Sequence, residues 1–345
     1  MVAKWKGGLH VANAIMLFLM ERNSKLMKNM MAIVCGVLML SGINAQCQGN
    51  LERPETISVS HLSVYSAEPE KTEHFYVHDL GATKGVDPQE PAGVRYYFNA
   101  VQFVEVLPLP PGQDPKNRFH GAGYNTSNAE AMRRYLGAHD VVVPSAVARG
   151  SDGSTYFAVK DPEGNQIEFV QPPLHPPAVP ASPVSEHIIH VGYIVHDVSK
   201  EDAFYITLLG FRPYWHGGMK DDTAEWISMQ LPNGQDWVEY MTAKGPEKTG
   251  IPAAMSQETA GVLDHFALGV ANIEHSYDVL FERGGLNGRH SPAQLGRDGK
   301  WQLNLYDPDG TRAELMEFQP AEKPCCSLFF VTKSHQVGSL SALTC

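Results

Sequence analysis

The chain has 345 residues, of which 43% are hydrophobic and 19% are charged, so its composition is that of a globular protein and excludes an intrinsically disordered one. The formal net charge of −11 argues against a nucleic-acid-binding protein, which needs Lys and Arg to displace counterions from phosphates. The length is sufficient for two domains of ordinary size.

Residues 1–45 have the features of an export signal. Lys28 precedes an apolar run from Met30 to Leu40, and Ala45 precedes a suitable cleavage point. The run is shorter than the ~20 apolar residues that a transmembrane helix requires. We therefore expect an exported protein, periplasmic or secreted, with no membrane span in its mature form. The alternative is a hydrophobic N-terminal segment that anchors the chain to a membrane.

Two segments, which start at Ile57 and Ile188, repeat one pattern. Each contains a His within an alternating apolar stretch that predicts a strand, and a polar loop follows. A Phe stands 14 positions after each His, and a Gly stands six positions after each Phe: His61, Phe75 and Gly81 in one segment, and His190, Phe204 and Gly210 in the other. A repeat at this scale is the first sign of a modular architecture.

A second kind of segment places His120 and His265 at the same strand position. Apolar residues at helical spacing follow in both copies, over Asn128–Leu136 and Glu274–Arg283. Both copies end in an Asp-Pro-x-Gly turn, in which Pro fixes φ and Gly tolerates positive φ. A strand with a carboxylate seven residues after the Asp then completes each copy, giving the pairs Asp161 and Glu168, and Asp307 and Glu314.

All four modules therefore run in the same order, with a His-bearing strand, a helix, further strands and a Glu-bearing strand. The intervals from His to Glu are 44, 48, 49 and 49 residues, for His61 and Glu105, His120 and Glu168, His190 and Glu239, and His265 and Glu314. Within the first module, Ala82–Arg95 is expected to form a loop instead of a strand. Four intervals of nearly equal length predict four copies of one structural unit.

This pattern resembles the vicinal oxygen chelate superfamily, which includes glyoxalase I, extradiol dioxygenases and bleomycin resistance proteins. The resemblance covers roughly residues 57–318, and its most specific part is the DPxGxxxE signature. It implies an α+β fold of four βαβββ modules, paired into two cup-shaped domains of mixed sheet. The expected boundaries are an N-terminal domain at 55–172, a Pro-rich linker at 173–185, a C-terminal domain at 186–320 and a tail at 321–345.

The resemblance also implies a metal centre, with ligands from the first and last strands of paired modules. In the C-terminal domain these are His190, Glu239, His265 and Glu314. Two imidazoles and two carboxylates suit one divalent ion such as Zn, Ni, Co, Mn or Fe(II). Glu314 and Glu239 are then candidate base and acid, and His290 is a further candidate acid or base in the loop before the last strands.

The N-terminal domain offers a second complete set, His61, Glu105, His120 and Glu168. Its first module is shorter, and two interpretations stay open: a second metal site, or a decayed domain retained for packing. We expect the C-terminal pair of modules to carry the main activity.

Three functions fit the resemblance. The first is a glyoxalase- or epimerase-like lyase or isomerase, which abstracts a proton next to a metal-chelated carbonyl. The second is an Fe(II) extradiol dioxygenase that uses the triad His190, His265 and Glu314, although Ala224–Gln230 lacks the additional His those enzymes carry. The third is a non-catalytic protein that binds a small ligand, as resistance proteins do. Each of these functions involves a small molecule, and for the enzymes this is a substrate with neighbouring oxygens. Two fused domains make a monomer plausible.

Overall fold

The computed structural model describes residues 51–113, 118–245, 251–255 and 264–330. The predicted export segment, residues 1–45, lies outside these ranges. Among the described residues, no helix has both the length and the apolar character needed to cross a membrane.

Each of the four expected modules is present as a strand, a helical segment and three further strands. The first comprises β1 (Thr56–Ser66), α2 (Pro69–Glu73), η1 (His74–Asp79), β2 (Thr83–Val86), β3 (Val94–Asn99) and β4 (Gln102–Pro108). The second comprises β5 (Phe119–Thr126), α3 (Ala129–Ala138), β6 (Ala148–Arg149), β7 (Thr155–Lys160) and β8 (Gln166–Gln171).

The third and fourth modules repeat this order. The third comprises β9 (Ile188–Val195), α4 (Val198–Asp202), η2 (Ala203–Leu208), β10 (Arg212–Gly217), β11 (Trp226–Gln230) and β12 (Trp237–Thr242). The fourth comprises β13 (His265–Val270), α6 (Ile273–Glu282), β14 (Gln294–Leu295), β15 (Trp301–Tyr306) and β16 (Arg312–Glu317). The α+β fold of four βαβββ modules is confirmed.

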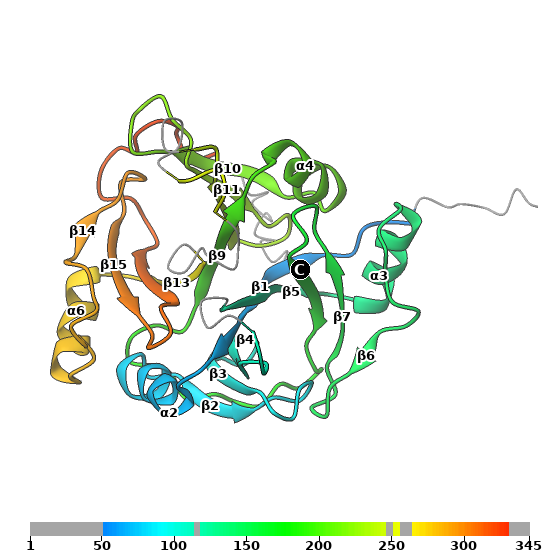
Figure 1. Ribbon diagram of the computed structural model, residues 1–345, viewed down its shortest axis with the longest axis horizontal. Coiled ribbons are helices and arrows are strands. Elements are labelled where there is room, and N and C mark those ends of the chain that lie inside the picture. Colours follow the sequence, from blue (N-terminus) through cyan, green and yellow to red (C-terminus); the bar gives the residue numbers. More distant parts are fainter. Residues whose placement is uncertain (1–50, 114–117, 246–250, 256–263, 331–345) are drawn as a thin grey trace, which may run out of the picture. The chain divides into compact units, whose positions relative to one another are not determined.

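Modules pair through their first strands to form two mixed, curled 8-stranded sheets (Figure 1). One sheet has the order β2-β3-β4-β1-β5-β8-β7-β6, and the other has the order β10-β11-β12-β9-β13-β16-β15-β14. Within every module the first and last strands are parallel, and the first strands of paired modules are antiparallel. The four central strands of each sheet are therefore the His-bearing and Glu-bearing strands.

Residues that recur in the repeat also end and begin the helices. Asn128 and Asn272 cap α3 and α6 by accepting a hydrogen bond from a backbone N–H of the first turn. Gly81 and Gly210, which follow η1 and η2, both have φ of +73°, a left-handed conformation in which an L side chain is strained. The repeated Gly is thus explained by the backbone and not by the site.

One hydrophobic core extends through both sheets, and polar bonds connect them. Gln102 on β4 donates to the carbonyl of Ile188 on β9 (2.8 Å) and accepts from its N–H (3.1 Å). Tyr124 and Tyr193, both fully buried, lie with their hydroxyls 3.2 Å apart. A buried hydroxyl or amide requires such a partner, so these bonds fix how the two sheets meet.

The expectation of a loop over Ala82–Arg95 is wrong, because Thr83–Val86 forms β2 and pairs with β3. The segment TKGV is too short to show strand periodicity, and Gly85 suggests a break. Gly85 in fact allows a close approach, since a Cβ there would lie 2.8 Å from the ring of Tyr97.

The residues between and after the two sheets contain no helix or strand among those described. Ser182 and Ser185 in the Pro-rich segment are buried and donate to the carbonyls of Leu80 and Gly269. The tail, residues 321–330, bonds to both ends of the second sheet. The N–H of Cys325 donates to the carbonyl of Arg297 in the turn after β14, and the N–H of Phe330 donates to the carbonyl of Tyr214 on β10. It contains a disulfide between Cys325 and Cys326.

Candidate metal centre

Two histidines face each other at the middle of the second sheet. His190 on β9 is paired with Ala267, and His265 on β13 is paired with Gly192. A Cβ on Gly192 would lie 2.2 Å from the imidazole of His265, so the glycine leaves the space that this ring occupies. Both rings are fully buried, and their Nε2 atoms are 3.0 Å apart.

Two carboxylates flank these rings from the neighbouring parallel strands. Glu239 on β12 is paired with Gly192, and Glu314 on β16 is paired with Ala267. The Oε2 of Glu314 lies 3.6 Å from His190 Nε2 and 3.8 Å from His265 Nε2. The Oε2 of Glu239 lies 3.4 Å from His265 Nε2. The structure therefore brings together all four residues that the repeat singled out in this half.

The spacing of these atoms fits a shared ion. Ligand atoms at about 2.0–2.2 Å from one metal can be at most about 4.4 Å apart. The three pairs formed by His190, His265 and Glu314 are 3.0, 3.6 and 3.8 Å apart. The donor set suits a borderline divalent ion, and His190 Nδ1 is buried without a hydrogen-bond partner among the described residues. Glu239 is not part of this group of three donors, but its distance to His265 makes it a candidate fourth donor.

The electrostatics favour the protonation states that metal ligands require. Burial raises the pKa of Glu314, but a hydrogen bond with His190 and the charge of Arg312 outweigh this and lower it to about 2. Burial and Arg312 lower the pKa of His265 below its usual value. Burial likewise raises the pKa of Glu239, but its bond to His265 gives a net lowering. Ionised carboxylates beside a neutral imidazole are ready to coordinate.

A cavity of about 340 Å³ opens above the two carboxylates. Besides Glu239 and Glu314, its lining includes Trp215, Trp226, Arg297, Gln302, Asn304 and Arg312. The tail borders it, because Trp215 Nε1 donates to the carbonyl of Cys325 (3.3 Å). A cavity with a few converging polar groups is the usual form of a small-molecule site.

His290 is not among the residues that line this cavity. Its neighbour Ser291 is bonded to Asn304, which lines the cavity and is paired with Glu314. The ring Nδ1 of His290 is buried with no hydrogen-bond partner among the described residues. A role for His290 in proton transfer stays a prediction.

The corresponding residues of the N-terminal half do not converge. The ring of His61 stacks on that of Phe103, with centroids 4.9 Å apart. The ring of His190 packs in the same way on that of Trp237, at 4.8 Å, so His61 and His190 occupy equivalent positions. His120, however, lies at an irregularity of β5, since Ser63 is paired with Gly121 and Val64 with Phe119. Its nitrogens instead contact the Tyr65 hydroxyl (2.6 Å) and the Gln166 amide (3.0 Å).

Strand register identifies the residue that stands in place of the second histidine. His265 is opposite Gly192, which is beside Glu239. In the N-terminal half Gly121 is opposite Ser63, which is beside Glu105. The equivalent of His265 is therefore a glycine, and the match in sequence to His120 is one residue out of register.

A buried guanidinium interacts with the carboxylates of this half. Arg95, only 2% exposed, lies 3.1 Å from Asp87 and 3.5 Å from Glu105, over the ring of Phe103. The other carboxylate, Glu168, accepts from Gln89 (3.1 Å). In the part of the chain that the structure describes, no three of His61, Glu105, His120 and Glu168 bring their donor atoms within 4.8 Å of one another. These residues do not fit a second ion.

Sequence reasoning missed Arg95 and Lys300, because buried cations carry no periodic signal. Lys300, 1% exposed, lies over the rings of Trp237 (4.7 Å) and Phe329 (5.1 Å) near Asp298. Burial lowers its pKa, whereas Asp298 and the two carboxylates of the centre oppose that shift. Lys300 thus places a positive charge beside the acidic donors.

Proteins of known structure share this fold. Solved structures similar to this chain include the homoprotocatechuate 2,3-dioxygenase of Brevibacterium fuscum in complex with 3,4-dihydroxyphenylacetate. That match has a TM-score of 0.56 and 16% identity, and it covers 78% of this chain and 82% of that one. The homoprotocatechuate 2,3-dioxygenase of Arthrobacter globiformis gives 0.57 and 16%, with coverage of 78% and 81%.

The 2,3-dioxygenase LapB of Pseudomonas sp. KL28 gives a TM-score of 0.57 and 13% identity, with coverage of 79% of this chain and 97% of that one. At these identities the likeness shows the fold alone. A comparison with curated proteins found no match. A family model matches residues 58–169 and 187–315, once for each pair of modules. The chain belongs to the Glyoxalase/Bleomycin resistance protein/Dioxygenase superfamily.

Proposed function

We propose that the chain is a metal-dependent lyase or isomerase that moves a proton next to a chelated carbonyl. The observation that carries this proposal is Glu239, a second buried carboxylate 3.4 Å from His265 Nε2, which lines the same cavity as Glu314. A buried carboxylate beside the binding position, in addition to the metal ligand Glu314, can remove a proton from a substrate and return it. Neither step needs an oxidant.

In this proposal His190, His265 and Glu314 hold the ion, and Glu239 is a fourth ligand or lies beside it. The bound ion would act as a Lewis acid on two neighbouring substrate oxygens and stabilise the negative charge that forms as the proton leaves. Glu239 or Glu314 takes the proton from the carbon next to the carbonyl. The carboxylic acid so formed returns that proton to the substrate, and the carboxylate is regenerated.

The walls of the cavity orient the substrate and exclude water. Arg297 and Arg312 line it and supply hydrogen-bond donors for an oxygen-rich ligand, while Trp215 and Trp226 supply apolar surface. The tail holds one of these walls in place through its hydrogen bond with Trp215. The carbon next to a carbonyl polarised in such a site loses its proton more readily than in water.

The test uses hydroxyacetone as a probe with neighbouring oxygens. In D2O the metal-loaded protein should catalyse exchange of the carbon-bound α-protons of hydroxyacetone, which NMR follows. Glu239→Gln should slow this exchange by about 100-fold, a typical contribution of general base catalysis. Purified protein that contains no metal and catalyses no exchange would instead favour a ligand-binding protein.

A second candidate is an Fe(II) extradiol dioxygenase. It is supported by the group His190, His265 and Glu314, which is a two-histidine, one-carboxylate triad of the kind found in iron oxygenases. Oxygen uptake on catechol by the iron-loaded protein would establish this candidate. Uptake that persists in Glu239→Gln would show that the fourth carboxylate is not required and would exclude the first candidate.

We also propose export of the protein, on the basis of the Lys28 and Met30–Leu40 pattern. N-terminal sequencing of the protein from a fractionated expression host tests this. A new N-terminus near Ala45 outside the cytoplasm is expected, whereas an uncleaved chain in the membrane fraction would support the anchored alternative.

A further inference from the structure

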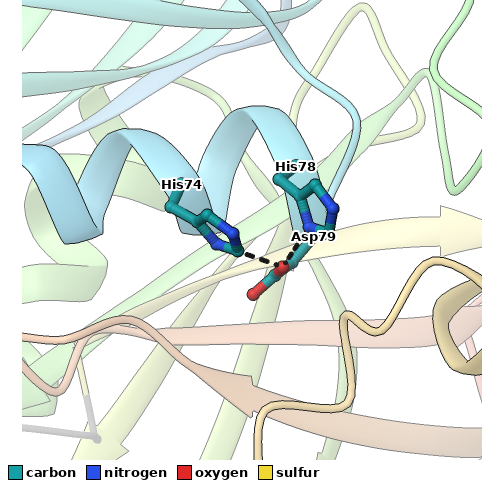
Figure 2. A group of neighbouring side chains, drawn as sticks. All are labelled: His74, His78 and Asp79. Atoms are coloured by element: carbon teal, nitrogen blue, oxygen red, sulfur yellow. Dashed lines mark hydrogen bonds and ion pairs between the residues drawn. The ribbon is translucent and has the colours of Figure 1, made fainter.

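Two histidines and a carboxylate outside the candidate metal centre meet on the surface of the first module. His74 and His78 lie one turn apart on η1, and Asp79 ends that segment. Figure 2 shows both imidazoles directed toward the Asp79 carboxylate. The Nδ1 of His78 is 2.9 Å and the Nδ1 of His74 is 3.5 Å from the same oxygen, Oδ1.

These atoms are close enough to share one ion. A donor atom from each of the three residues lies within 4.8 Å of the others, and both distances to Asp79 are below the limit of about 4.4 Å set by two metal bonds. The two rings stack with centroids 4.4 Å apart, so their orientation is already restricted. The three donors are therefore already close together in this structure.

Burial differs among the three residues in a way that suits an accessible site. The Asp79 side chain is 3% exposed, whereas those of His74 and His78 are 63% and 51% exposed. The carboxylate is therefore held in place, and the rings remain open to solvent on their other side. An ion bound here can complete its coordination with water.

The surroundings fix the position of the carboxylate. Gly285, just after α6, packs against Asp79, since a Cβ there would lie 3.1 Å from the Asp79 Cα. Arg283 donates two hydrogen bonds to the carbonyl of His78 (2.6 and 3.1 Å). The end of the fourth module thus supports the donors of the first module.

We propose that His74, His78 and Asp79 bind a borderline divalent cation of the Zn²⁺ class, separately from the candidate metal centre. Imidazole nitrogen is a good ligand for such ions and a poor one for Mg²⁺ or Ca²⁺, which prefer all-oxygen sites. Because Asp79 contacts the segment after α6, the bound ion stabilises the contact between the first and fourth modules.

The experiment measures bound zinc on the full chain after chelator treatment and equilibrium dialysis. We expect one more zinc ion per chain in the wild type than in the double variant His74→Ala/His78→Ala. In a His265→Ala background, which removes a ligand of the candidate metal centre, the double change should weaken the remaining zinc binding by more than about 100-fold. His175→Ala, an exposed His in the Pro-rich segment, serves as the control.

Thermal unfolding gives an independent readout, because an ion that binds only the folded state raises Tm. Zinc should raise the Tm of His265→Ala but not that of the triple variant, and Mg²⁺ should raise neither. Equal zinc content in the wild type and the double variant would overturn the inference. Loss of an ion in the double variant but not in His265→Ala would leave the inference standing and instead contradict the metal centre of the proposed function.

Discussion

Equivalent points of the two sheets carry different groups in the two halves of the molecule. In the C-terminal half, His190, His265 and Glu314 converge at distances suited to an ion. In the N-terminal half, Arg95 lies beside Asp87 and Glu105. Positive charge is required in both places, because buried carboxylates without a partner are costly. A guanidinium fixed to the backbone satisfies that need but leaves no Lewis acid for a substrate.

Strand pairing shows how small the change between the halves is. Arg95 is opposite Glu105, and the residue opposite Glu239 is Ser228. Gly121 stands where His265 stands in the other half. One added guanidinium and one lost imidazole therefore separate a structural half from a half that can bind a metal.

The largest expected effect distinguishes the two histidines that the repeat equates. His265→Ala removes an imidazole from the centre, and we expect activity to fall by at least about 1000-fold, or about 4 kcal/mol of transition-state stabilisation. His120→Ala removes contacts to Tyr65 and Gln166 only, and activity should stay within about 3-fold. Turnover and bound metal are measured for both. Loss of activity in His120→Ala with normal activity in His265→Ala would reverse the assignment of the working half.

The pattern of modules, the four helical positions and the C-terminal donor set could all be predicted, because each depends on residue spacing that repeats along the chain. The absence of a second centre could not, since His120 differs from the equivalent position by one residue at a strand irregularity. Sequence spacing does not resolve a one-residue shift, which is what decides where a strand side chain points. Strand β2 was missed because Gly85 suggests a turn in the sequence. In the structure this glycine instead makes room for the ring of Tyr97, a contact that the sequence does not reveal.

The second effect concerns the stability of the N-terminal half. Arg95→Met would leave the Asp87 carboxylate buried without its closest cation, and we expect a loss of about 3 kcal/mol or more in the free energy of unfolding. Arg134→Met is the matched control, because that side chain is 59% exposed and lies 3.9 Å from Glu130. The control should change stability by less than about 1 kcal/mol. Denaturant unfolding measures both, and an equal effect would show that Arg95 does not replace the ion.

The third prediction transfers the cation from one half to the other. Ser228→Arg introduces a guanidinium opposite Glu239, where it should pair with that carboxylate and repel a metal ion. We expect metal affinity and activity to fall by about 100-fold, because a misplaced or competing charge in a reaction site has effects of that size. Ser228→Met adds comparable length without charge. If both variants lose activity equally, crowding and not charge is responsible.

The effect that is smallest per pH unit is a difference in pH dependence between the halves of the metal-free protein. Burial raises the pKa of Glu105 from 4.5 to about 8. The folded state therefore retains a proton that the unfolded state releases, so this contribution to stability is complete below pH 4.5 and is lost as the pH rises through about 8. For Glu314, whose pKa is lowered to about 2, the contribution is complete above pH 4.5 and is lost as the pH falls through about 2.

Between pH 5 and pH 8 the wild type should lose stability with a slope of at most about 1.4 kcal/mol per pH unit from Glu105. Glu105→Gln keeps the neutral form and its bond with Ser63, so this part of the slope should disappear. Glu314→Gln should leave the slope in this range unchanged, because Glu314 is ionised throughout it. Denaturant unfolding at several pH values in chelator measures all three proteins. A slope that persists in Glu105→Gln would mean that another buried group, such as Glu168 with a pKa of about 7, controls the pH dependence of the N-terminal half.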